Sequence, residues 1–275
     1  MTYSDVLENK SIAVSTSHSP DMKGLGLHDE HLRDAMTEIA RHTLALGAKL
    51  VYGGDLRKEG FSALLFELAA RYRRDSKDSR KLGVTNYLAW PVHIRETPEH
   101  LFQVAADLEG TAELRLLDIN GKDIGLAGRR DLPTRQPSEP EWTKGLSAMR
   151  LTMRQATHAR IILGGVVDKF MGSMPGIAEE ALYSLQGRQP IYIMGGFGGC
   201  ARDVAEAIGV LEPRRVRDWR GRDRFQKFRG KSLRNGLSAE ENRILASTPH
   251  VEQAIVLILR GLTKAKLHSE ADHDR

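Results

Sequence analysis

Apolar residues in this chain occur in two patterns, as short continuous runs and at helical spacing in longer stretches. Between residues 28 and 46 the apolar positions fall three and four apart, which predicts an amphipathic helix that ends at Gly47. The short runs predict strands at residues 10–15, 48–52, 87–92, 112–117, 159–163 and 191–194. Strands that alternate with helices predict a Rossmann-like, doubly wound α/β fold, with a mostly parallel sheet and helices on both faces.

The same pattern places the remaining helices at residues 61–72, 98–108, 141–157, 176–186, 201–208 and 238–262. The last of these begins with Ser238-Ala239-Glu240-Glu241, which has the form of a capping box. Residues 73–81 form a charged connector. Residues 120–140 contain three prolines and are predicted to be a long loop, which either covers a site or projects into solvent.

Two glycine-rich segments each follow a predicted strand and lead into a predicted helix. The first runs from Gly164-Gly165 to Gly176, and the second is Gly195-Gly196-Phe197-Gly198-Gly199. Glycine permits positive φ and a close approach of the backbone to a ligand, and the first amides of a helix offer unpaired donors to a phosphate. These turns therefore predict a nucleotide site, and tight strand-to-helix turns without a ligand are the alternative.

A third glycine turn, Gly53-Gly54-Asp55, and a polar turn with Ser15 and Ser17 follow two further strands. The serine hydroxyls either bind a phosphate or ribose or cap a helix, and Asp55 either contacts a ribose or caps the helix after Gly54. The switch point of a doubly wound sheet brings such turns together. We therefore expect the ligand site at the carboxyl ends of the strands.

The composition is that of an ordinary globular chain of 275 residues, with 40% hydrophobic and 28% charged residues. The first residues lack a basic region followed by an apolar one, and the longest strongly apolar stretch, 254–259, is too short to span a bilayer. We expect a cytoplasmic protein that does not contact membranes. The single cysteine, Cys200, excludes an intramolecular disulfide and a cysteine-rich zinc site, and we expect neither a metal nor a cofactor.

Basic residues are concentrated at 214–234, where they alternate with Trp219, Phe225 and Phe228, in a chain of net charge +5. One interpretation is an electropositive surface with stacking groups, suited to nucleic acid, a nucleotide or an acidic partner protein. The other is a solvated surface segment. Because the stretch follows the last glycine turn by one predicted helix, we expect it to serve an interface or the rim of the ligand site rather than to bind nucleic acid.

These loops together resemble the SLOG superfamily, the Rossmann-like group that includes the LOG phosphoribohydrolases and the DprA/Smf DNA-processing proteins. The LOG enzymes carry a glycine-rich strand end, then glycine-threonine and a glutamate, after a helix with an arginine-lysine pair. The matching residues here are Leu163-Gly164-Gly165, Gly176, Glu179, Glu180 and Arg150. The similarity extends from Ile12 to about Ile208 and is strongest to branches associated with bacterial conflict systems that use TIR or sirtuin-type NADases.

The resemblance implies a single nucleotide-binding domain over residues 1–275, with a core at about 10–210 and a C-terminal basic segment and helix at 211–264. It also implies binding of a nucleotide such as ADP-ribose or a cyclic derivative as a signal. Ile177 stands where the hydrolases have a hydroxyl residue, and residues 166–175 are inserted between the glycines. These differences retain a nucleotide pocket but weaken the case for hydrolysis.

The residues support the same site by their chemistry. Arg150 offers a bidentate contact to a phosphate, and Glu180 offers an acceptor to ribose hydroxyls. The alternatives are an exposed helix cation for Arg150 and, for Glu179 and Glu180, the preference of acidic residues for the first turn of a helix. Lys169 either neutralises a phosphate or is solvated. The residues assigned to nucleotide binding are Ser15, Ser17, Gly53, Gly54, Asp55, Arg150, Gly164, Gly165, Lys169, Gly172, Gly176, Glu179, Glu180, Gly195, Gly196, Phe197, Gly198 and Gly199.

The leading hypothesis is a sensor of an NAD-derived or adenine-nucleotide signal that acts through homo-oligomers or a separate effector protein. The alternative is a nucleotide N-glycosidase, in which Glu180 and Arg150 would be catalytic, because a carboxylate near a ribose stabilises an oxocarbenium-like state and aligns water. A weaker third hypothesis is a DNA-processing or nucleic-acid-binding protein that uses residues 214–234.

Overall fold

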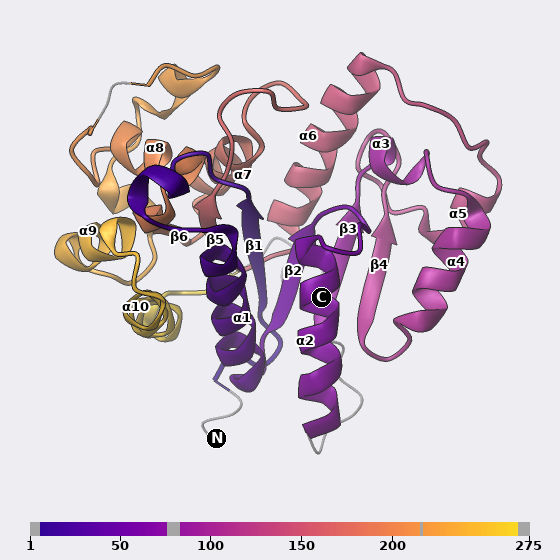
Figure 1. Cartoon of the computed structure of the whole chain (residues 1–275), viewed down its shortest axis with the longest axis horizontal. Coiled ribbons are helices and arrows are strands. Elements are labelled where there is room, and N and C mark those ends of the chain that lie inside the picture. Colours follow the sequence, from indigo (N-terminus) through magenta and orange to yellow (C-terminus); the bar gives the residue numbers. More distant parts are fainter. Residues whose placement is uncertain (1–5, 76–82, 215–216, 269–275) are drawn as a thin grey trace.

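The computed structural model describes residues 6–75, 83–214 and 217–268. Within these residues, six strands form one sheet: β1 (Ser11–Ser17), β2 (Lys49–Gly53), β3 (Val84–Leu88), β4 (Ala112–Leu116), β5 (Ala159–Gly164) and β6 (Ile191–Met194). Their order is β4-β3-β2-β1-β5-β6, and every neighbouring pair is parallel (Figure 1). The order reverses between β1 and β5, so the fold is Rossmann-like and doubly wound, as predicted.

The helices surround this sheet. They are α1 (Asp29–Ala45), α2 (Phe61–Asp75), α3 (Trp90–His93), α4 (Pro98–Asp107), α5 (Gly125–Arg130), α6 (Glu139–Gln155), α7 (Gly176–Gln186), α8 (Gly199–Ala207), α9 (Ala239–Ser247) and α10 (Val251–Lys264). Short 3-10 turns, η2 (Met22–Leu25), η3 (Gly195–Phe197), η4 (Arg222–Phe225) and η5 (Gly230–Leu233), lie in the connections. Local signals explain several ends: a capping box between Ser138 and Glu141 begins α6, and the hydroxyl of Thr97 caps α4.

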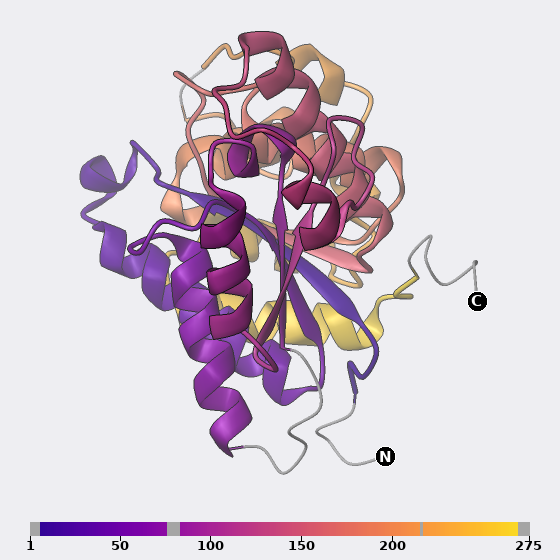
Figure 2. The same ribbon diagram turned by 90° about the vertical axis from the view of Figure 1, so that its right-hand side faces the viewer.

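Both faces of the sheet are buried, and the alternation of side chains decides which residue goes to which face. Ile12 and Val14 of β1 belong to a core shared with α1, α2 and α10, whereas Ile162 of β5 belongs to a core shared with α7 and α8. Ser15 therefore points to the α7 face. Figure 2 shows the sheet between these two helical layers.

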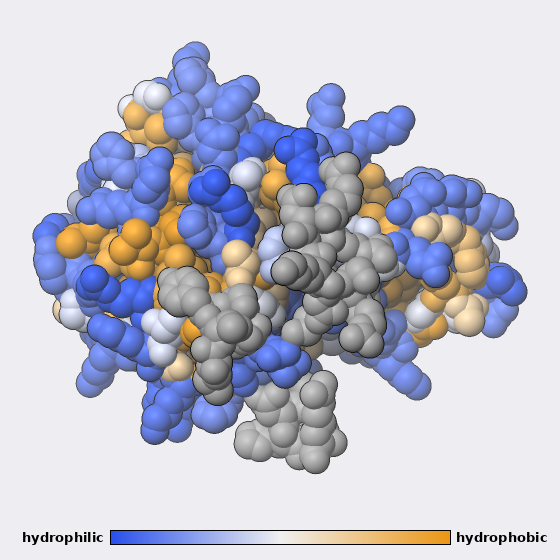
Figure 3. Space-filling view, turned by 90° about the horizontal axis from the view of Figure 1, so that it is seen from below, coloured by the Kyte–Doolittle hydropathy of each residue, from blue (hydrophilic) through white to orange (hydrophobic). Residues whose placement is uncertain are grey.

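The C-terminal helices complete the first of these cores. Leu245 of α9 and Ile258 of α10 are buried in the cluster that contains β1 and α1. The opposite face of α10 leaves Val256 58% exposed. From below, apolar surface is visible on the side of the molecule where α10 lies (Figure 3).

Three predicted elements were wrong in their bounds. The strand predicted at 87–92 is β3 at Val84–Leu88, followed by the short helix α3, because Pro91 cannot donate to a sheet ladder but fits the first turn of a helix. The loop predicted at 120–140 contains α5 and the start of α6. The helix predicted at 238–262 is divided into α9 and α10, because Pro249 forces Thr248 into an extended conformation.

The connector predicted at 73–81 begins as the last turn of α2, which continues to Asp75, and its residues 76–81 lie outside the described residues. Among the residues that the structure describes, no helix combines the length and the apolar character needed to cross a membrane.

Candidate functional site

A cavity of about 850 Å³ opens at the carboxyl ends of β1, β2 and β5, where the strand order reverses. Its walls come from the end of β1, the turn after β2, the inner side of α6 and the first turn of α7, which surround the upper end of the sheet in Figure 1. We call it the switch-point pocket. The predicted site residues that line it are Ser15, Ser17, Gly53, Gly54, Asp55, Arg150, Gly176 and Glu180.

A buried ion pair forms the floor of this pocket. Arg160, the second residue of β5, is 0% exposed, and its Nη1 lies 2.5 Å from Oε2 of Glu180 and 2.7 Å from Oγ of Ser15. The Ser15 hydroxyl also donates to Glu180, and Nε of Arg150 lies 3.7 Å from Oε1 of Glu180. Burial lowers the pKa of Arg160, and the charge of Glu180 opposes that shift. The carboxylate thus compensates a guanidinium that has no access to water.

Arg160 is a site residue that the sequence analysis missed. It lies within the run that predicted a buried strand, and β-strand alternation turns it toward the α7 face together with Ile162. Its position inside a predicted strand could have identified Arg160. A parallel sheet is buried on both faces, and a buried charge rarely lacks a partner.

Glu179, the neighbour of Glu180, faces away from the pocket and holds a loop. Its carboxylate accepts hydrogen bonds from Ser147 at 2.6 Å and Ser173 at 2.9 Å and pairs with Arg150. Burial would raise the pKa of Glu179, but Arg150 and these hydrogen bonds hold it below its usual value. Glu179 therefore fastens the 166–175 loop to α6.

Two polar groups in the pocket wall have no hydrogen-bond partner among the described residues. They are the Oγ1 of Thr16 at the end of β1 and the Nε of Arg150. Both residues are 7% exposed. Buried donors are normally satisfied, so their lack of partners is unusual. In addition, no side chain of the described residues caps the N-terminus of α7, whose first residues line the same pocket.

The outer wall of the pocket carries an aromatic ring and a charged pair. Trp142 of α6 lines the pocket, and the guanidinium of Arg95 lies 5.2 Å from the centroid of its ring. Asp55 pairs with Arg57 at 2.7 Å in the turn after β2. The walls therefore combine an aromatic surface, carboxylates and cations.

Several glycines in the walls make room for neighbouring side chains. A Cβ at Gly176 would lie 2.7 Å from Nη2 of Arg150, and one at Gly53 would lie 2.7 Å from Sδ of Met153. A Cβ at Gly54 would lie 2.2 Å from the ring of Tyr52. At Gly54 the rigid ring of Tyr52 requires glycine whether or not a ligand approaches, whereas at Gly53 and Gly176 the ends of flexible methionine and arginine side chains would have to shift.

The predicted residues between β5 and α7 lie beside the pocket rather than in its lining. Gly164 and Gly165 have φ values of 64° and 94°, and a Cβ at Gly164 would lie 2.6 Å from the carbonyl oxygen of Ser17. Lys169 and Gly172 belong to the loop that Glu179 fastens, and Lys169 has a left-handed φ of 53°. Their contact with a ligand stays a prediction.

The glycine turn after β6 is packed under α9 and is not part of the pocket lining. A Cβ at Gly196 would lie 1.9 Å from the carbonyl oxygen of Thr248, and one at Gly195 would lie 2.4 Å from that of Ala246. Phe197 is 0% exposed. The Cβ of Asp21 crowds Gly198, and Asp21 Oδ2 accepts from the backbone amide of Gly199 at 2.7 Å. The structure thus gives this turn a packing role, and its proposed ligand contacts are untested.

Asp21 belongs to a second charged group at the carboxyl edge. Arg217 lies 2.6 Å from Asp21 and 3.4 Å from Asp203 of α8. Burial raises the pKa of Asp203 to about 6, Arg217 opposes the shift, and Asp21 adds to it. For Asp21, burial is outweighed by Arg217 and the Gly199 amide, so its pKa lies below the usual value.

The structure contradicts one interpretation of the basic stretch 214–234, in which its aromatic residues provide stacking groups at the surface. Trp219 is 5% and Phe225 0% exposed, and the two rings pack edge to face with centroids 5.5 Å apart in the α7–α8 core. Phe228 packs against the same cluster. Trp219 and Phe225 are therefore core residues and do not provide a surface for base stacking.

Among the described residues, no group of histidine, cysteine and acidic side chains is arranged to hold a metal ion. In comparison with known proteins, the model of a family described as SLOG cluster2 matches residues 6–229. No curated protein matches the chain.

Proposed function

The chain belongs to the SLOG cluster2 family, which indicates a nucleotide-related function, and from this premise we propose that it senses a nucleotide signal. The proposed ligand is an adenine nucleotide or an NAD-derived molecule such as ADP-ribose or its cyclic form, bound in the switch-point pocket. The proposed setting is a bacterial antiviral or conflict system, in which the bound state is passed on through oligomers or a separate effector protein.

The observation that carries the proposal is the chemistry of the pocket wall. At the switch point of the sheet, Thr16, Arg150 and the N-terminus of α7 line one cavity, and among the described residues Thr16 Oγ1 and Arg150 Nε have no hydrogen-bond partner and no side chain caps α7. Donors of this kind suit the phosphates of a nucleotide. Asp55 and Glu180 offer acceptors for ribose hydroxyls, and Trp142 offers a ring for a base. A cavity of about 850 Å³ is within the usual range for such a ligand.

Glu180 also keeps the N-glycosidase alternative open, because its carboxylate lines the pocket. That carboxylate is already engaged by Arg160 and Ser15. This engagement favours a binding role over the activation of water. Accordingly, we expect no release of free base from NAD, AMP or ADP-ribose on incubation with the protein, as followed by chromatography. Steady base release would establish the enzyme in place of the sensor.

Thr16 permits a test of binding that does not depend on the ion pair. In Thr16→Val the buried hydroxyl without a partner becomes a methyl group, so the free protein should unfold at an equal or higher temperature. Because the hydroxyl is proposed to meet the ligand, the affinity for the nucleotide should fall by about tenfold, corresponding to about 1.4 kcal/mol. Calorimetric titration with AMP, ADP, ADP-ribose, cyclic ADP-ribose and NAD measures this affinity.

Thr43→Val is the matched control. Thr43 is also buried, but its hydroxyl donates to the carbonyl oxygen of Ile39 at 2.6 Å within α1. This variant should lose stability and retain its nucleotide affinity. A wild type that binds none of the five nucleotides, or a Thr16→Val variant that binds as the wild type does, would contradict the proposal.

A further inference from the structure

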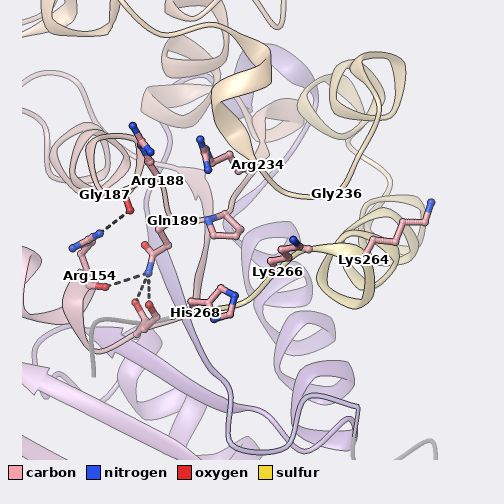
Figure 4. Close-up of a pocket in the computed structure, with 12 residues that line it drawn as sticks. Arg154, Gly187, Arg188, Gln189, Arg234, Gly236, Lys264, Lys266 and His268 are labelled. Atoms are coloured by element: carbon pink, nitrogen blue, oxygen red, sulfur yellow. Dashed lines mark hydrogen bonds between the residues drawn. The ribbon is translucent and has the colours of Figure 1, made fainter. Parts of the chain in front are cut away.

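A second pocket, of about 660 Å³, lies at the amino ends of β5 and β6, on the edge of the sheet opposite the switch-point pocket. Four segments that are distant in the sequence line it: the end of α6, residues 187–190 after α7, residues 234–236 after η5, and residues 264–268 at the end of α10. Figure 4 shows the residues that line it. We call it the basic pocket.

The lining is cationic. It carries Arg154, Arg188, Arg234, Lys264, Lys266 and His268, and no aspartate or glutamate among the described residues. Over the part of the chain that the structure describes, no carboxylate pairs with Arg188, Arg234 or Lys266. Exposed arginines elsewhere do find such partners, as Arg41 does with Glu38 and Arg71 with Glu67. Other exposed cations, such as Arg130 and Arg229, also have no carboxylate partner among the described residues, so this pocket is distinguished by the three such cations that line it together.

Two of these cations have an unfavourable backbone conformation. Arg188 has a φ of 56° and Arg234 a φ of 50°, in the left-handed region that glycine normally occupies. Arg188 directly follows Gly187 at the end of α7, where a glycine commonly terminates a helix. Strained conformations of this kind concentrate at functional sites. Here the strain places a guanidinium on the pocket wall at both positions.

Helix termini explain part of the charge but not all of it. Cations are favoured at helix C-termini, and α6, α7 and α10 all end here. Arg154 has this role, because its Nη2 donates to the carbonyl oxygen of Gly187 at 2.7 Å (Figure 4). No such bond from Arg188, Arg234 or Lys266 occurs among the described residues. Figure 4 also shows that Lys264 points away from the other side chains.

The floor of the basic pocket is polar and fixed. Gln189 is buried, and its Nε2 donates to the carbonyl oxygen of Thr157 at 2.6 Å and to Oγ1 of Thr157 at 2.9 Å. Its Oε1 accepts from Ser184 at 2.7 Å. Because these groups are already paired, Arg188, Arg234 and Lys266 are the cations of the pocket that have no carboxylate partner among the described residues.

We propose that the basic pocket binds a small anion with several phosphate groups, such as a polyphosphate chain. The guanidinium groups of Arg188 and Arg234 suit paired phosphate oxygens, and Lys266 adds a third positive charge. No tryptophan, tyrosine or phenylalanine lines the pocket among the described residues, so it offers no ring on which bases of a single strand would stack. These cations line a single hollow rather than an extended surface, which favours a compact anion over a nucleic acid backbone.

The test is calorimetric titration with tripolyphosphate at about 50 mM and about 200 mM salt. We expect the wild type to bind it and Arg188→Gln/Arg234→Gln to bind at least about tenfold more weakly. The matched control, Arg41→Gln/Arg71→Gln, removes the same charge from exposed helix positions and should bind as the wild type does. Arg188→Gly/Arg234→Gly removes the charge while keeping the backbone conformation, so it replaces the glutamine variant if that variant does not fold.

Two further experiments identify which pocket binds tripolyphosphate and whether the ligand is a small anion or a nucleic acid. Arg57→Gln/Lys58→Gln removes cations from the switch-point pocket and should leave tripolyphosphate binding unchanged. Loss of binding in that variant, with binding retained in Arg188→Gln/Arg234→Gln, would overturn the assignment. Tighter binding of single-stranded or duplex DNA than of tripolyphosphate, lost in Arg188→Gln/Arg234→Gln, would replace the small anion with nucleic acid. No binding of tripolyphosphate by the wild type at the lower salt concentration would refute the proposal.

Discussion

The two pockets at opposite edges of the sheet use charged residues in opposite ways. In the switch-point pocket, Arg160 and Glu180 are paired, and Arg160 is fully buried. In the basic pocket, Arg188 and Arg234 are exposed and have no carboxylate partner among the described residues. The first pocket lies at the N-terminus of a helix and the second at helix C-termini. The buried pair of the first pocket therefore stabilises the fold, whereas Arg188 and Arg234 of the second are the residues that we propose bind an anion.

A chain of hydrogen bonds connects the two floors. Ser184 of α7 donates to Gln189 at 2.7 Å in the basic pocket and accepts from Nε of Arg160 at 3.1 Å. Arg160 in turn pairs with Glu180 in the switch-point pocket. The two sites thus share one buried polar network across α7, and a substitution in the ion pair is expected to affect the whole network.

The largest expected effect tests whether the charges of the switch-point pocket hold the fold. Glu180→Gln leaves Arg160 buried without a counter-charge, so the free energy of unfolding should fall by about 3–5 kcal/mol. Urea denaturation measures it. Arg160→Met/Glu180→Gln removes both charges and should recover most of the loss.

Glu240→Gln serves as the control for this substitution. Glu240 forms an exposed pair with Arg243, so its loss should change the free energy of unfolding far less than the loss of the Glu180 carboxylate. If Glu180→Gln cost no more than Glu240→Gln, the buried pair would not be structural and the contrast between the pockets would fail.

A second test asks whether the glycine turn after β6 belongs to the fold or to the ligand site. Gly196→Ala places a Cβ against the backbone of Thr248 and should reduce the free energy of unfolding by about 1–3 kcal/mol. Gly24→Ala, where a Cβ meets nothing within 4 Å, is the control in the same denaturation experiment. If Gly196→Ala were as stable as the wild type but no longer bound the nucleotide, this turn would belong to the ligand site.

A third test concerns Asp203, whose charge at the carboxyl edge is less well compensated than that of Glu180. Its pKa of about 6 in the folded protein exceeds the unfolded value, so the folded state binds the proton more tightly. This contribution to stability is present below about pH 4 and is lost as the pH rises to about 6. Asp203→Asn should thus be equal to the wild type near pH 4 and more stable by about 1–3 kcal/mol near pH 7.

The stability of the variant must be compared with that of the wild type at each pH, because the titration of His93 changes the stability of both proteins in the opposite direction. Burial lowers the pKa of His93 to about 4, so its contribution to stability is lost as the pH falls from about 6.5 toward 4. The difference between Asp203→Asn and the wild type removes this background. A difference that does not vary with pH would contradict the assignment to Asp203.

The smallest expected effect is in the basic pocket. Arg188→Gly relieves the left-handed strain but increases the freedom of the unfolded chain, so the free energy of unfolding should change by less than about 1 kcal/mol. Thermal unfolding measures the change. A loss above about 2 kcal/mol would mean that Arg188 stabilises the fold, and the charges of the basic pocket would not be free for a ligand.

Local patterns in the sequence determined the alternation of strands and helices and the glycine turns at the strand ends, whereas the point at which the strand order reverses is known only from the structure. Each local pattern follows from periodicity or from the conformational range of one residue type, so no tertiary information is needed. The prediction was wrong where a proline acts through its neighbours, as at Pro91 and Pro249.

Only the tertiary structure decided what the charged residues do. Glu179 and Glu180 are adjacent in the sequence, but one turn of α7 directs the first to the 166–175 loop and the second to Arg160 and the pocket. Likewise, the basic pocket is assembled from residues that are far apart in the chain, from Arg154 to His268. The energy of a charge depends on its burial and on partners that are distant in sequence, and these are determined only when the chain has folded.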